Sequence, residues 1–138
     1  MFLLIAWLAF VPQEALADAS NYCLWMLLVD THATATRCGK PLDAAAEARY
    51  QQLRGAAEAE IVRDAPLRPG MTQEKARAVM ADYVAHSMNG GAAFPAYCAG
   101  ADAPMAIRML DGFTNKEAAA KFIAGLNAKK DPFDGECL

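Results

Sequence analysis

The sequence predicts an all-α fold, a small single-domain bundle in which about four main helices run up and down. Apolar residues recur at spacings of three and four over several long segments, as on one face of a helix. No stretch of useful length alternates apolar and polar residues as a β-strand does. The chain has 138 residues and four cysteines, so we expect two disulfides to staple one domain.

The first segment, residues 1–17, predicts a cleaved signal peptide. An apolar run covers residues 2–11, Pro12 ends it, and Ala15-Leu16-Ala17 gives a small-x-small cleavage pattern before Asp18. The run is shorter than the roughly 20 residues of a membrane-spanning helix. A buried N-terminal helix is the alternative. We therefore expect residues 18–138 to form a single domain in the periplasm or outside the cell, without a transmembrane span after cleavage.

The first expected helix follows in "NYCLWMLLVDTHATATRC". Its opening is too uniformly apolar for one face to be picked out, which predicts a helix that is buried on most sides. Cys38-Gly39-Lys40-Pro41 is a typical stop, with Gly just past the end and Pro beyond.

Two amphipathic helices are expected next, each with a polar residue as its N-cap. Asp43 is the expected cap of the first, with a buried stripe at Ala46, Tyr50, Leu53, Ala57 and Ile61. Thr72 is the expected cap of the second, with a stripe at Ala76, Val79, Met80, Tyr83 and Val84. Asn89-Gly90-Gly91 ends it.

The last clear helix is expected to begin at "TNKE", where Thr114 and Glu117 match a capping box. The segment between residues 90 and 113 predicts a loop with a short helix capped by Asp102.

The four cysteines are predicted to pair across the ends of the bundle. Short connections make neighbouring helices antiparallel, which brings Cys98 back to Cys38 and delivers Cys137 to Cys23. An 18-residue helix is about 27 Å long, and disulfide Cα atoms lie only about 4.4–6.8 Å apart. This geometry favours Cys38–Cys98 and Cys23–Cys137.

Composition and motifs argue against several functions. The chain carries 13 basic and 16 acidic residues, a net charge of −3, with both signs interspersed. We therefore expect no nucleic-acid partner. No nucleophile or acid/base motif is present, and no C-x-x-C occurs. The prediction is a protein without enzymatic activity or cofactor.

Two sets of residues remain as candidate sites. His32 and His86, the only histidines, would be weak metal ligands together with Met88 or Asp82. The alternative is that both are hydrogen-bonded, partly buried histidines. Phe94 and Tyr97 precede Cys98 in "FPAYC", and an aromatic loop pinned by a disulfide predicts either a partner-binding surface or a lid over the bundle.

The stretch "TQEKARAVMADYVAH" and the cysteines near helix ends resemble small exported helical proteins of Gram-negative bacteria, including periplasmic immunity proteins that block cell-wall amidases. The resemblance covers about a tenth of the chain, and the cysteine order otherwise differs. We expect a helical binding or interaction protein, inhibitor- or immunity-like, with a protein partner in the cell envelope. A periplasmic metal or small-cofactor carrier using His32 and His86 is the alternative, and the oligomeric state stays open.

Overall fold

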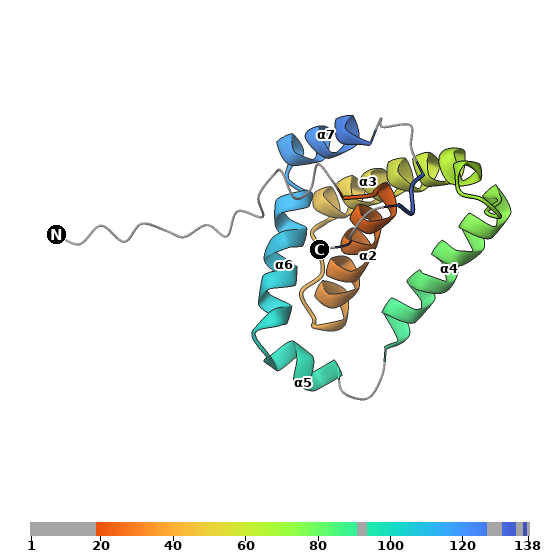
Figure 1. The fold of residues 1–138 in the computed structure, drawn as a ribbon. Coiled ribbons are helices and arrows are strands. Elements are labelled where there is room, and N and C mark those ends of the chain that lie inside the picture. Colours follow the sequence, from red (N-terminus) through yellow and green to blue (C-terminus); the bar gives the residue numbers. More distant parts are fainter. Residues whose placement is uncertain (1–18, 91–93, 127–130, 135–136, 138) are drawn as a thin grey trace.

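The computed structural model describes residues 19–90, 94–126, 131–134 and 137. In this part of the chain the regular structure is entirely helical, which confirms the predicted all-α class (Figure 1). The elements are α2 (Asn21–Arg37), α3 (Ala44–Asp64), the 3-10 turn η1 (Ala65–Leu67), α4 (Gln73–Asn89), α5 (Phe94–Ala99), α6 (Asp102–Phe113) and α7 (Lys116–Gly125). The predicted signal peptide, residues 1–17, lies outside the described residues.

Helix α2 is the centre of the molecule, with α3, α4 and α6 packed around it (Figure 1). Its N-cap is Ser20, whose hydroxyl accepts a hydrogen bond from the Cys23 amide at 3.1 Å. Buried Thr31 satisfies its hydroxyl by donating to the carbonyls of Leu27 and Leu28. The helix ends at Cys38, and Gly39 takes a positive φ of 70°, a conformation that glycine adopts without strain.

The core lies on two sides of α2. One cluster is built where α2 meets α3, α4 and the chain after α7, from Trp25, Val29, Ala57, Ile61, Met80 and Leu126. The other lies where α2 meets α3, α6 and α7, and consists of Leu28, Ala35, Tyr50, Leu53, Leu110 and Ala119. Every described turn of α2 therefore contributes to burial, as its uniformly apolar opening predicts.

Helices α3 and α4 begin at the predicted caps. Asp43 accepts from the Ala46 amide, and Thr72 accepts from the Lys75 amide. The predicted stripe of α3 is buried from Tyr50 onwards. On α4 only Ala76 and Met80 are buried among the helix residues, and Val79 is 39% exposed. Helix α4 therefore lies at the edge of the bundle with a narrower buried face than predicted.

The segment between Gly90 and Thr114 is more helical than expected. Helix α6, and not a helix starting at Thr114, returns along α2 from the lower end of the molecule to the upper end (Figure 1). Asp102 is the first residue of α6, and no side chain caps that helix. Helix α7 is a short element that packs on α3 at the upper end.

The predicted capping box is displaced by one residue. Thr114 is the C-cap of α6, and its hydroxyl donates to the Leu110 carbonyl at 2.9 Å. Asn115 is the cap of α7, and its side chain accepts from the amides of Glu117 and Ala118. Both residue types can fill a cap, so the sequence alone did not distinguish them.

Both predicted disulfides are present. Cys23 and Cys137 join the start of α2 to the tail with a Cα–Cα distance of 5.2 Å. Cys38 and Cys98 join the end of α2 to α5 with a Cα–Cα distance of 5.4 Å. The antiparallel arrangement of neighbouring helices thus gives the pairing that the helix lengths favour.

The described part of the tail packs against the start of α2. The Pro132 carbonyl accepts a hydrogen bond from the Tyr22 amide at 3.0 Å, and Pro132 is fully buried. The rings of Phe133 and Tyr22 lie 4.9 Å apart. At Pro132 and Phe133 the tail is therefore part of the core.

None of the helices in the described ranges has the length and apolar character that crossing a membrane would require.

Removing the Cys23–Cys137 disulfide tests how much the link between the tail and α2 stabilises the fold. In the Cys23→Ser/Cys137→Ser variant we expect the free energy of unfolding to fall by about 2–5 kcal/mol, because the unfolded chain regains the freedom of a long loop. Urea unfolding followed by far-UV circular dichroism measures this change. The Cys38→Ser/Cys98→Ser variant is the matched comparison. A wild-type unfolding midpoint in the first variant would refute a stabilising clamp.

Candidate functional site

The candidate partner-binding residues Phe94 and Tyr97 lie on the short helix α5, not on an open loop. Their rings are 5.4 Å apart. The Cys38–Cys98 disulfide ties this helix to the end of α2. Phe94 and Tyr97 lie on α5, Met105 on the first turn of α6 and Met88 on the last turn of α4, and these helix ends all lie at the lower end of the molecule (Figure 1). We call these four residues the α5 end.

Arg37 fixes the position of α5. Its guanidinium lies over the Phe94 ring, 3.3 Å from the ring centroid. The same group donates to the Ser87 carbonyl at 3.2 Å and to the Gly90 carbonyl. Arg37 thus connects the last turns of α2 and α4 to the first residue of α5, and a cation–π contact with a half-buried ring adds to the hydrogen bonds.

The two aromatic residues therefore have different roles. Phe94 is half-buried under Arg37. Tyr97 is 38% exposed, Met88 39% and Met105 47%. Three of the five large hydrophobic side chains that are exposed in the described residues thus belong to the α5 end. The other two, Leu67 and Val79, lie on η1 and α4.

His32 is a hydrogen-bonded, partly buried histidine. Its Nε2 lies 2.8 Å from Glu47 Oε2, and its ring stacks on Tyr50 with 3.8 Å between centroids. Burial raises the pKa of Glu47, but hydrogen bonds with Gln51 and His32 and the charge of His32 lower it more. The carboxyl pKa therefore lies below its ordinary value.

The two histidines face different surroundings. His32 faces α3. Asp30 lies two positions earlier, about 200° away around α2, and accepts hydrogen bonds from Tyr83 and Ser87 of α4. Helix α4, which carries His86, therefore packs on a different side of α2 from His32. His86 is exposed on α4. Among the described residues no three His, Cys, Asp or Glu side chains form a group that could hold a metal ion.

A polar chain along α3 was not predicted. Glu58 Oε1 accepts from the Trp25 indole N–H at 3.0 Å and from Arg54 Nε at 2.6 Å. The spacing of Arg54 and Glu58 is a sequence signal for an i,i+4 ion pair. The Trp25 contact comes from another helix and has no such local signal.

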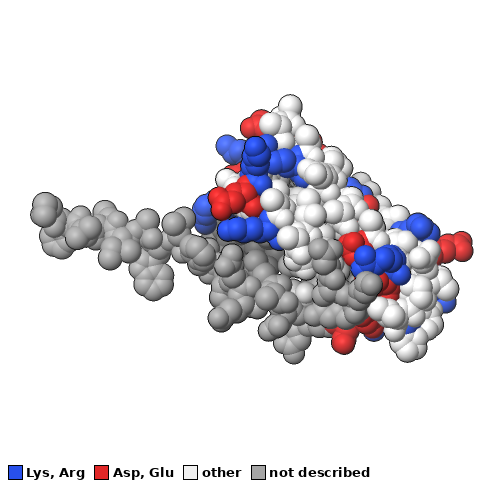
Figure 2. Space-filling model, turned by 90° about the horizontal axis from the view of Figure 1, so that it is seen from above, with Lys and Arg blue, Asp and Glu red and all other residues white. Residues whose placement is uncertain are grey.

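Surface charge is mixed on the face seen from above. Figure 2 shows Lys and Arg side chains beside Asp and Glu side chains, without a continuous basic stripe. This distribution agrees with the interspersed charges of the sequence.

Tyr50 provides a test of the packing around His32. Burial raises its pKa to about 12, against the lowering effect of Arg54. Above pH 10 the unfolded chain loses the phenolic proton before the folded chain does, so stability falls as pH rises towards 12. Tyr50→Phe has no phenolic proton to lose. Its free energy of unfolding should therefore fall by up to about 2–3 kcal/mol less than that of the wild type between neutral pH and pH 12.

Urea unfolding at neutral and alkaline pH measures this difference, with Tyr97→Phe as the exposed control. An equal alkaline loss in Tyr50→Phe and wild type would contradict a buried phenol at this position.

Gly90 provides a test of the Arg37 contacts. A Cβ atom at Gly90 would lie 2.7 Å from Arg37 Nη1, so Gly90→Ala should displace the guanidinium from its carbonyl and ring partners. We expect faster amide exchange in α5 and a stability loss of about 1 kcal/mol. The control is Gly55→Ala, where no atom lies within 4 Å of the added Cβ; it should stabilise α3 by about 0.5–1 kcal/mol. Unchanged α5 protection in Gly90→Ala would show that Arg37 does not hold α5.

No family model, curated protein or solved structure matches this chain.

Proposed function

We propose that this chain is an exported protein-binding protein without catalytic activity, which engages its partner through the α5 end. The observation that carries the proposal is that Met88, Tyr97 and Met105 are all exposed and lie on α5 or on the helix ends next to it in the chain, and a disulfide fixes α5 to α2. Aromatic and methionine side chains are enriched in protein interfaces. Exposed hydrophobic side chains that gather on one surface are a mark of interaction sites.

The fixed geometry of α5 favours tight recognition. A surface held by a disulfide and by Arg37 loses little conformational entropy when a partner binds. Phe94 contributes by supporting Arg37, while Tyr97 and Met105 are free to contact the partner. An inhibitor- or immunity-like role fits such a rigid surface.

Export is supported by two features of the chain. Disulfides persist in oxidising compartments and are rare in the cytosol, and the two disulfides involve all four cysteines. The apolar run at residues 2–11, followed by Ala15-Leu16-Ala17, has the pattern of a secretory signal. We place the protein in the periplasm or outside the cell.

The carrier alternative receives less support. His32 is engaged by Glu47 and Tyr50 on the α3 side of α2, and His86 lies exposed on α4. A metal or cofactor held by both would require His32 to leave its partners. The elemental content of protein purified from its native compartment tests this alternative directly.

Site-specific photo-cross-linking tests the proposed binding surface. A photoreactive phenylalanine analogue at Tyr97 should form an adduct with one defined partner in the native cell envelope. The same analogue at Leu67, a more exposed hydrophobic position on η1 away from the α5 end, should not. Adducts of equal pattern at both positions would rule out the α5 end as the specific surface.

Substitution then measures how much the side chains of the α5 end contribute to the binding free energy. Tyr97→Ser/Met105→Ser should weaken binding of the identified partner about tenfold or more, since loss of an interface anchor removes over about 1 kcal/mol. The fold should be unchanged because both side chains are exposed. Binding is measured by calorimetry, with Leu67→Ser as the control; wild-type affinity in the double variant would refute the proposal.

A further inference from the structure

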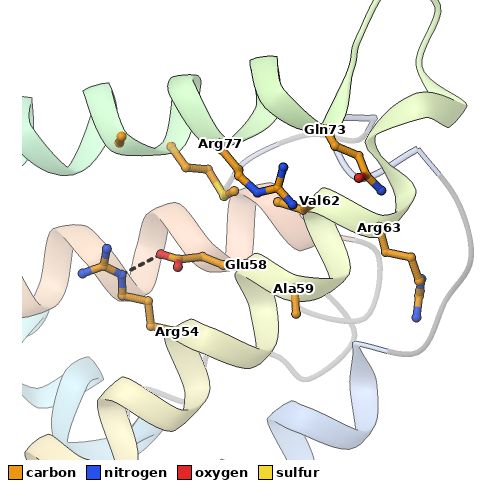
Figure 3. A pocket seen from close by; sticks show the side chains of 9 residues that line it. Arg54, Glu58, Ala59, Val62, Arg63, Gln73 and Arg77 are labelled. Atoms are coloured by element: carbon orange, nitrogen blue, oxygen red, sulfur yellow. Dashed lines mark hydrogen bonds and ion pairs between the residues drawn. The ribbon is translucent and has the colours of Figure 1, made fainter.

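A cleft lies between α3 and the first half of α4, away from the α5 end (Figure 3). It is an open depression of about 560 Å³ and not an enclosed cavity, and Gln73 and Arg77 at its edge are exposed. Half-buried Val62 and buried Met80 form its apolar part. This apolar part can contact one side of the hydrocarbon portion of a small ligand.

Three arginines surround this apolar part, and two of them have partners within the protein. Arg54 donates to Glu58. Arg63 donates to both carboxylate oxygens of Asp64, at 2.9 and 2.7 Å. The positive charges of these two guanidiniums are balanced by neighbouring carboxylates. Arg54 and Arg63 therefore contribute mainly to the shape of the cleft and little to its net charge.

Arg77 is the third arginine and differs from the other two. It forms no ion pair or hydrogen bond with any residue in the described ranges, and its side chain is directed from α4 into the cleft (Figure 3). Gln73 lies one turn earlier on the same helix, and its amide also faces the cleft (Figure 3). A guanidinium and an amide N–H on one helix face can together bind a carboxylate.

We propose that this cleft binds a small amphipathic carboxylate. The hydrocarbon part packs on Val62 and Met80, and the carboxylate pairs with Arg77 and accepts a hydrogen bond from Gln73. Glu58 also lines the cleft, but its charge is balanced by Arg54, so Arg77 is the group that attracts the carboxylate. This site is independent of the α5 end and does not rest on the proposed partner binding.

The test is a titration of the disulfide-bonded protein with sodium hexanoate, followed by amide chemical shifts. Shifts should be confined to the cleft, at Ala59, Val62, Met80 and Ala81. Hexan-1-ol, which has the same chain length without the charge, should bind more weakly. Arg77→Gln should weaken hexanoate binding about fivefold, the effect of losing one partly solvated ion pair.

Arg108→Gln is the matched control, since Arg108 is an exposed arginine on α6 outside the cleft; it should bind hexanoate as the wild type does. Three results would overturn the proposal. These are no saturable shifts in the cleft at millimolar hexanoate, equal affinity for hexanoate and hexan-1-ol, or unchanged affinity in Arg77→Gln. Each leaves the proposed role of the α5 end unaffected, because that surface is tested through Tyr97 and Met105.

Discussion

Burial of α2 on most of its sides is the constraint on which the rest of the fold depends. Trp25 and Leu28 lie on this one helix, both without exposed surface, and each belongs to a different core cluster. Full burial of such side chains stabilises the fold by about 1.5–3 kcal/mol each, but only if neighbours cover both faces. Helices α3, α4 and α6 supply that cover, and the polar groups that must enter the core, such as Thr31 and the Trp25 indole, have hydrogen-bond partners.

Much of this arrangement could be predicted from local signals. Asp43 and Thr72 each precede an amphipathic helix and are preferred N-cap residues. The helices are too long for a disulfide to join their two ends, which favours pairing Cys38 with Cys98 and Cys23 with Cys137. The extent of α6 and the burial of Pro132 could not be predicted in the same way. Both depend on contacts with α2 that are distant in sequence, and Thr114 and Asn115 carry equivalent local cap signals.

The candidate sites show the same division. Phe94 and Tyr97 stand out in the sequence because two aromatics precede a cysteine. Phe94 is covered and Tyr97 is exposed because Arg37, the last residue of α2, lies over the Phe94 ring. The α3–α4 cleft gives no sequence signal either, since the charged face of a helix looks alike whether its arginines are paired, as Arg54 is, or unpaired within the described residues, as Arg77 is.

The two disulfides are nested, because the bond from Cys23 to Cys137 encloses the bond from Cys38 to Cys98. A single cut of the backbone anywhere between Cys23 and Cys137 therefore leaves both fragments covalently joined. Between Cys38 and Cys98 the fragments stay joined by two bonds, and this interval contains the exposed connection from Pro66 to Gly70. If a protease cuts this connection, α2 and α5 stay attached to each other through the Cys38–Cys98 bond. The α5 end can therefore keep its structure after the backbone has been cleaved.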